Sequence, residues 1–138
     1  MAGTFSLDIV TPERLVYQGE VTSLQAPGLD GLFGVLHNRA PLLAALGPGQ
    51  VTFEPLHETA QHLAVSGGFL QVAANKAVLL ADQAEFAHEI EREEAERRLA
   101  QAREALGGLI LSDEELAARR KLVDVAAARA RVAAPTRR

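Results

Sequence analysis

An abrupt change of composition after Ala84 is the feature that most constrains this sequence. Residues 1–84 contain 10 charged side chains, nine of the 11 glycines and five of the six prolines. Residues 85–138 contain 22 charged side chains and are rich in Ala, Glu and Arg. A charge-poor block interrupted by glycine and proline indicates strands, and an Ala/Glu/Arg block indicates helices. We therefore predict a β domain over residues 1–84 and a helical region over residues 85–138.

Short strands are predicted along the first block. Phe5, Leu7 and Ile9 alternate with polar residues, which is the period of a half-buried strand. Further strands are predicted between turn residues at 20–26, 51–53, 63–65, 69–72 and 78–80. This close spacing, with no helical pattern between the strands, favours an antiparallel sandwich or barrel. The apolar segment 31–36, continued by 40–43, is interpreted as a loop that either packs under the sandwich or offers a protein-binding patch.

Two helices are predicted in the second block. From about residue 89 to 106, small or apolar residues follow a narrow helical stripe, and Gly107-Gly108 predicts the helix end. Ser112 and Glu115 form a capping box that begins a second helix, which continues to about Ala133. The short connection predicts an antiparallel hairpin. Because alanine dominates the inner stripe and buries little area, this hairpin is expected to leave its resting place at modest cost.

Charge in the helical region is polarised. Residues 85–115 carry a net charge of −6, and residues 116–138 carry +6. Folded together, the two helices attract each other. In an opened hairpin, the last helix would be a basic rod suited to an acidic partner.

The sequence contains no assembled active site. It has no cysteine and no nucleotide-binding glycine motif, and its four histidines lack metal-site spacing, so they are read as ordinary surface residues. Ser66, before Gly67-Gly68, is interpreted as part of a tight corner between strands and not as a nucleophile. The net charge of −4 and the single aromatic residue after Ala84 argue against nucleic-acid binding. With no signal peptide or membrane span, a cytoplasmic location is expected.

Five short motifs in order resemble the epsilon subunits of F-type ATP synthases. They are 8–13 (DIVTPE), 28–34 (GLDGLFG), 40–43 (APLL), 46–49 (LGPG) and 65–69 (VSGGF), and the Ala/Glu/Arg hairpin follows them. The resemblance covers nearly the whole chain, from about Thr4 to Arg131. It implies a ten-stranded antiparallel β-sandwich followed by a C-terminal two-helix hairpin.

The resemblance also implies a function. Family members are non-catalytic rotor subunits of the central stalk. They couple proton translocation to ATP synthesis at the cytoplasmic face of the bacterial membrane, and their hairpin inhibits ATP hydrolysis. The resemblance assigns contacts with the gamma subunit and the c-ring to Asp30, Gly31, Leu32, Phe33, Gly34, Val35, Arg39, Ala40, Pro41, Leu42 and Leu43. Inhibitory contacts with the beta subunits, during transient association with the alpha and beta subunits, are assigned to Arg119, Arg120, Lys121, Arg129 and Arg131.

This sequence departs from the family pattern at several of these positions. Arg39 stands where the family has a histidine before Ala-Pro, and Leu32 stands where an acidic residue is frequent. Some family members bind ATP on the folded hairpin through an Ile/Leu-Asp-x-x-Arg-Ala motif, in which this chain has Glu91 and Glu94 for Asp and Arg. We therefore expect a degraded ATP site at Glu85, Glu91, Glu94 and Arg129, with weak or no ATP binding and no other cofactor or metal. The alternative function is a ligand-binding β-sandwich with a helical oligomerisation tail.

Overall fold

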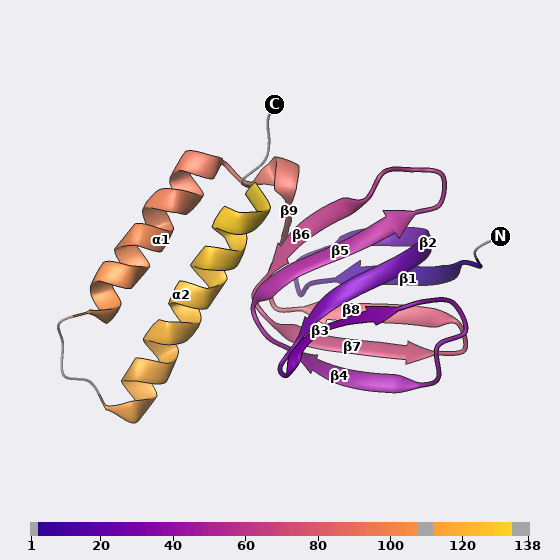
Figure 1. Cartoon of the computed structure of the whole chain (residues 1–138), viewed down its shortest axis with the longest axis horizontal. Helices are drawn as coiled ribbons and strands as arrows, with labels where there is room; N and C mark the ends of the chain where they lie inside the picture. The colour runs from indigo at the N-terminus through magenta and orange to yellow at the C-terminus, as the bar shows by residue number, and fades with distance from the viewer. Residues whose placement is uncertain (1–2, 108–111, 134–138) are drawn as a thin grey trace.

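In a computed structural model that describes residues 3–107 and 112–133, the first block forms nine strands (Figure 1). They are β1 (Phe5–Val10), β2 (Leu15–Gly28), β3 (Gly31–Val35), β4 (Leu42–Leu46), β5 (Gly49–Pro55), β6 (Gln61–Val65), β7 (Gly68–Ala73), β8 (Lys76–Ala81) and β9 (Ala84–Phe86). Every strand predicted from the sequence is confirmed. The interpretation of 31–36 and 40–43 as a loop is wrong, because most of this segment forms β3 and β4, with Val35 and Leu46 buried in the core.

Strand β2 belongs to both sheets of the sandwich. Its first half pairs with β1, and its second half pairs with β3 and β5. One sheet therefore has the order β4-β7-β8-β1-β2, and the other has the order β3-β2-β5-β6-β9. The nine strands of the described residues thus fill the ten positions that the resemblance implies. Within the same residues, β1 and β8 pair in parallel, whereas the other strand pairs are antiparallel.

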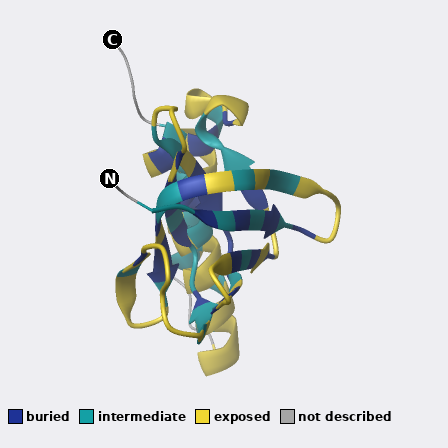
Figure 2. Ribbon diagram, turned by 90° about the vertical axis from the view of Figure 1, so that its right-hand side faces the viewer, coloured by how far each residue is buried: buried dark blue, intermediate teal, exposed yellow. Residues whose placement is uncertain are grey.

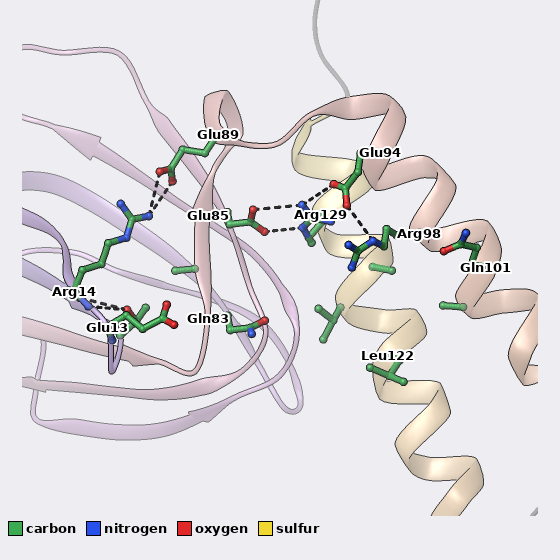
Figure 3. Close-up of a pocket in the computed structure, with 15 residues that line it drawn as sticks. Glu13, Arg14, Gln83, Glu85, Glu89, Glu94, Arg98, Gln101, Leu122 and Arg129 are labelled. Atoms are coloured by element: carbon green, nitrogen blue, oxygen red, sulfur yellow. Dashed lines mark hydrogen bonds and ion pairs between the residues drawn. The ribbon is translucent and has the colours of Figure 1, made fainter.

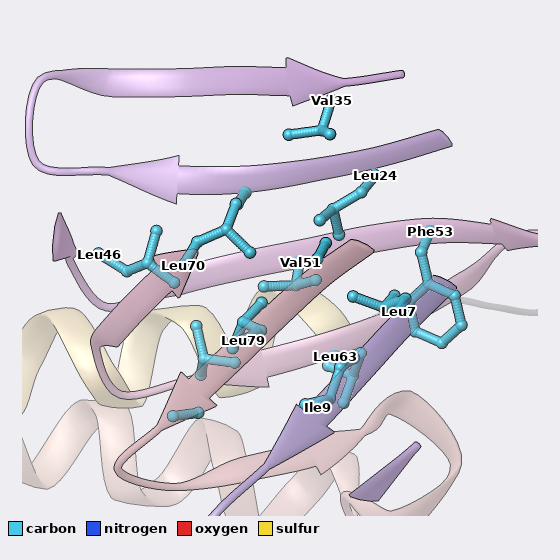
Figure 4. Packing of buried hydrophobic residues seen from close by; sticks show 14 of the residues in the cluster. Leu7, Ile9, Leu24, Val35, Leu46, Val51, Phe53, Leu63, Leu70 and Leu79 are labelled. Carbon is cyan, nitrogen blue, oxygen red and sulfur yellow. The ribbon is translucent and has the colours of Figure 1, made fainter. Parts of the chain in front are cut away.

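The core lies between the two sheets (Figure 4). Leu7 of β1 and Leu79 of β8 meet Leu24, Phe53 and Leu63 from the opposite sheet, and none of these side chains is more than 2% exposed. In the view of Figure 2, buried residues gather inside the sandwich, and the loops at its end are largely exposed. Burial on this scale is the main force that stabilises a domain of this size.

The Ser66-Gly67-Gly68 segment forms the tight corner between β6 and β7 that the sequence predicts. Gly68 has a φ of +146°, and a Cβ atom at this position would overlap the carbonyl oxygen of Leu80. Glycine is therefore required by both the backbone conformation and the close approach of β8.

The second block begins with a short 3₁₀ turn, η1 (Ala87–Glu89), followed by α1 (Arg92–Leu106) and α2 (Asp113–Ala133). The capping box is confirmed, because Ser112 Oγ accepts a hydrogen bond from the Glu115 N–H at 3.2 Å, and the Glu115 carboxylate accepts one from the Ser112 N–H. Helix α1 ends at Leu106, as predicted, while Gly108 and the rest of the connection to residue 111 lie outside the described residues.

Helix α2 lies between α1 and the sandwich and contacts β5 and β6 (Figure 1). The sequence predicts a single stripe on this helix, at Leu116, Val123, Ala127 and Ala130. This stripe is incomplete, because the most buried side chains are those of Ala126, Ala128 and Val132. A helix with neighbours on two sides buries residues on two faces, which one stripe cannot describe.

Strand β9 continues past the predicted boundary at Ala84. Phe86 packs against the sandwich core, and its ring centroid lies 6.4 Å from that of Phe53. The sandwich therefore extends to Phe86, and the hairpin is attached to it through η1.

Candidate functional site

Three side chains from three elements meet where the hairpin rests on the sandwich (Figure 3). Arg129 of α2 donates to Glu85 of β9, with an Nε–Oε1 distance of 2.6 Å, and to Glu94 of α1, with an Nη2–Oε1 distance of 3.1 Å. The Arg129 side chain is only 20% exposed. We call Arg129, Glu85 and Glu94 the Arg129 junction. It links the sandwich to both helices.

An open cleft of about 880 Å³ lies beside the Arg129 junction, and its other two arginines are also paired (Figure 3). Arg98 donates to the second carboxylate oxygen of Glu94 at 3.0 Å. Arg14, from the turn between β1 and β2, contacts Glu89 of η1 at 3.0 Å. Each of the three arginines that line the cleft therefore already has a carboxylate partner.

These contacts shift the pKa values of the groups involved. The hydrogen bond from Arg129 holds the pKa of Glu94 below its usual value. The hydrogen bond to Glu85, followed by that to Glu94, raises the pKa of Arg129. The pKa of Glu89 is lowered mainly by the hydrogen bond from the Phe86 N–H, with a further contribution from Arg14. The ionised forms are thus the ones that the folded arrangement stabilises.

Most of the predicted ATP-site residues are brought together by the fold. Glu85, Glu94 and Arg129 form the Arg129 junction, whereas Glu91 is exposed at the beginning of α1 and lies outside the junction. The sequence identified these residues through the family resemblance. The ion pairs between them were not predicted, because Arg129 is 44 residues from Glu85 and 35 residues from Glu94 in the chain.

The predicted basic face of α2 is divided by the folded hairpin. Arg129 belongs to the junction, and Arg119 donates to the carbonyl oxygen of Ala105 at the end of α1 at 2.8 Å. Arg120, Lys121 and Arg131 are exposed. Two of the five predicted cations therefore stabilise the folded hairpin.

The first predicted interface segment surrounds the turn between β2 and β3. Asp30, Gly31 and Gly34 are exposed, and Leu32 is 65% exposed. Phe33 is partly buried against the core, and the Val35 side chain, 1% exposed, lies within it. The Val35 side chain thus belongs to the core and does not contribute to the surface.

The second predicted segment leads into β4 at the opposite end of the sandwich. Arg39, Ala40, Pro41 and Leu43 are exposed, whereas Leu42 packs partly against the core. The backbone N–H of neighbouring Asn38 donates to Asn75 Oδ1 at 2.7 Å, between β7 and β8. The first segment instead adjoins the turn after β4, where the Gly47 N–H donates to the Pro27 carbonyl at 2.9 Å. Asp30 and Gly31, at the tip of the first segment, therefore lie at the opposite end of β3 and β4 from Arg39, Ala40 and Pro41.

A larger apolar surface was missed by the sequence reasoning. Cross-strand pairing places Val10, Leu80, Phe69 and Ala45 in one row across β1, β8, β7 and β4, with Leu43 two residues before Ala45. Leu43, Phe69 and Leu80 are 73%, 55% and 50% exposed. We call these five residues the outer apolar face. Its signal is the adjacent pairs Phe69-Leu70 and Leu79-Leu80, which place apolar side chains on both faces of their strands.

The described residues contain no group of three or more His, Asp or Glu side chains arranged to bind a metal ion. Within the same part of the chain, no helix is both long and apolar enough to cross a membrane.

Comparisons with known proteins match this architecture. A sequence model of the ATP synthase delta/epsilon chain β-sandwich domain matches residues 4–87. An ATP synthase epsilon chain from Moorella thermoacetica is 42% identical over 132 residues, which are 91% of this chain and 96% of the relative. Another, from Anaeromyxobacter dehalogenans, is 45% identical over 129 residues, which are 93% of this chain and 96% of the relative.

Solved structures share the fold. A chain of the Euglena gracilis mitochondrial ATP synthase superposes with a TM-score of 0.79 at 18% identity, covering 92% of this chain and 79% of that one. A chain of the Tetrahymena thermophila mitochondrial ATP synthase, from a structure of the central stalk and c-ring, has a TM-score of 0.65 at 16% identity. That match covers 91% of this chain and 96% of that one.

Proposed function

Because the chain belongs to the delta/epsilon chain family of ATP synthases, we propose that it is a non-catalytic rotor subunit of the enzyme's central stalk. Its sandwich binds the gamma subunit and the c-ring and couples proton translocation to ATP synthesis. Its hairpin restrains ATP hydrolysis through transient contacts with the alpha and beta subunits. It reaches the cytoplasmic face of the bacterial cell membrane through the complex, as a peripheral subunit.

The outer apolar face is the observation that carries this proposal. An exposed phenylalanine flanked by two exposed leucines on one sheet is unfavourable in water and is suited to a protein partner. The gamma subunit is the partner we assign to it. The exposed parts of the turn at Asp30 to Leu32 and of the segment from Arg39 to Pro41 are polar or mixed, and we assign them to the c-ring.

The alternative, a ligand-binding domain with an oligomerisation tail, agrees less well with the helices. Ala128 and Val132 of α2 are buried in a cluster that includes Ala64 of the chain's own sandwich. A helix whose buried face is already used within the chain has little apolar surface left for a second copy. Leu122 is the one large apolar side chain of the described part of α2 that is mostly exposed.

The gamma subunit provides the direct test. Purified chain, mixed with gamma alone, should form a one-to-one complex that survives gel filtration. Failure to bind gamma, while the chain is folded by circular dichroism, would refute the rotor assignment.

We further propose that nucleotide binding by the hairpin is weak or absent. A polyphosphate would have to displace Glu85 and Glu94 from Arg129 and would then lie beside both carboxylates. Calorimetric titration with Mg-ATP should show no site tighter than roughly millimolar. A micromolar one-to-one isotherm would contradict this. Glu94→Arg should strengthen binding if the predicted pocket is correctly placed.

A further inference from the structure

The hairpin rests on the sandwich through an apolar contact made mostly of small side chains. The cluster that joins them consists of Ala64 from β6, Ala95 from α1, Ala128 and Val132 from α2, and Ile90 from the linker. Three of these five residues are alanine, whose side chain contributes roughly 1 kcal/mol or less on burial. Val132 is thus the largest side chain that α2 contributes to this cluster.

The Arg129 junction is placed where it can stabilise the docked position of the hairpin. Its three side chains come from β9, α1 and α2. The pair with Glu85 forms only when α2 lies on the sandwich, and the pair with Glu94 forms only when the two helices are packed together, so both exist at once only in the docked hairpin. Arg129 is largely shielded from water, and its guanidinium donates three hydrogen bonds to the two carboxylates. Charge-assisted hydrogen bonds in such shielded positions are stronger than those of exposed ion pairs.

We propose that the Arg129 junction is a built-in electrostatic lock, in which the Glu94 and Glu85 carboxylates bind Arg129 and thereby hold the hairpin docked without any ligand. The docked fraction is then set by ionic conditions and by partner proteins that compete for Arg129. The inference deepens the proposed regulatory role of the hairpin and rests on it for its biological consequence, but the lock itself is a property of the isolated chain.

The lock also makes docking and partner binding mutually exclusive. Arg129 cannot contact an acidic partner while Glu85 and Glu94 hold it, and Arg119 is likewise occupied by the end of α1. Detachment exposes Arg129 together with the apolar side of α2. Variants of the glutamates therefore leave the residues assigned to the inhibitory contact in place, although Glu94→Gln also removes the pair with Arg98 within α1. Arg129 variants also remove a residue assigned to the inhibitory contact.

Thiol labelling of the full chain tests the lock. The chain has no cysteine, so Ala64→Cys introduces a single thiol at a position that is 4% exposed beneath the hairpin. A small aromatic disulfide reagent reacts with it only in the detached state, so the labelling rate reports the detached fraction even when this fraction is small.

In this background, Glu94→Gln should raise the labelling rate by roughly three- to tenfold. Glu96→Gln is the matched control. It makes the same chemical change two residues away on α1 and breaks only the exposed pair between Arg92 and Glu96. Its rate should stay within about twofold of the parent rate, because such exposed pairs contribute little. Arg129→Gln should accelerate labelling at least as much as Glu94→Gln.

Salt provides a second measurement. Raising the ionic strength from about 0.05 M to about 0.5 M should increase the labelling rate of the parent. The difference in labelling rate between the parent and Glu94→Gln should then become smaller. Equal rates for Glu94→Gln and Glu96→Gln would overturn the proposed lock. If Glu94→Gln accelerates labelling but leaves ATP hydrolysis by the reassembled enzyme unchanged, the lock stands and the inhibitory role of the hairpin fails.

Discussion

The two outer faces of the sandwich are built for different kinds of contact. The face formed by β5, β6 and β9 is covered by the chain's own helices, through alanines and the ion pairs of Arg129. The face formed by β1, β8, β7 and β4 is uncovered and presents Leu43, Phe69 and Leu80. Large apolar side chains favour a lasting contact, whereas small side chains joined by ion pairs favour a contact that can open. Under the proposed function, the sandwich thus combines a lasting interface on one face with a contact that can open on the other.

The largest effect is expected from polar substitution on the uncovered face. Phe69→Gln together with Leu80→Gln should weaken gamma binding by about a hundredfold or more, because two large apolar contacts are lost. Both side chains are at least half exposed, so the fold should be retained. Leu122→Gln, which makes the same kind of change on α2, is the control and should leave gamma affinity unchanged. Surface plasmon resonance with immobilised gamma measures both.

Removing α1 and α2, which cover one face of the sandwich, should distinguish the role of the hairpin from that of the uncovered face. A chain ending at Glu89 keeps β9 and the Arg14–Glu89 ion pair, so it should stay folded and bind gamma normally. ATP hydrolysis by the enzyme assembled with it should rise. A chain ending at Glu85 also loses Phe86, which should cost about 1–3 kcal/mol of sandwich stability in thermal unfolding. Loss of gamma binding by the longer truncation would contradict the division between the faces.

The sequence predicted only part of the structure that distinguishes the two outer faces of the sandwich. Alternation at Phe5, Leu7 and Ile9 predicted β1, and the Ser112–Glu115 box predicted the beginning of α2, because both signals are local. Strand β3 was not predicted because Gly31 and Gly34 are typical of turns, although Val35, which follows Gly34, is buried. Local sequence patterns thus predicted a strand or helix wherever its residues were not also typical of turns.

Long-range pairing was beyond the sequence reasoning. The role of β2 in both sheets depends on strands that follow it, and the outer apolar face depends on the register of four strands. Similarly, Glu85, Glu94 and Arg129 were grouped only through family resemblance. Arg129 pairs with both carboxylates because α2 lies between α1 and the sandwich. No local sequence pattern encodes this position of α2.

A smaller effect is expected from charge reversal on α2. Arg120→Glu with Lys121→Glu reverses two exposed charges and leaves the contact between Arg119 and the end of α1 intact. If the detached helix docks on acidic loops, inhibition of ATP hydrolysis should fall several-fold, and its salt sensitivity should fall with it. Adding Arg119→Glu should also loosen the hairpin, because the helix end loses its donor. Inhibition that is unchanged at low salt would mean that steric blockade, and not charge, restrains the enzyme.

The smallest expected effect is a pH dependence of docking that originates at Glu94. Its pKa is lowered in the docked hairpin, chiefly by the hydrogen bond from Arg129, with Arg98 and Arg97 contributing charge. Detachment returns this pKa toward the ordinary value of 4.5, so the detached state binds more protons in acid. The contribution of Glu94 to docking is therefore complete above that ordinary value and is lost as the pH falls through the lowered one.

Fluorescence energy transfer measures this dependence. Dyes on Ala73→Cys in β7 and Ala118→Cys in α2, both exposed positions, report the distance between sandwich and hairpin. Lowering the pH from about 6 to about 4 should increase the detached fraction a few-fold. Glu94→Gln has no carboxylate to protonate at this position, so it should start from a larger detached fraction and respond less to acid. Glu96→Gln should behave like the parent, and an undiminished acid response in Glu94→Gln would assign the titration to a group outside the Arg129 junction.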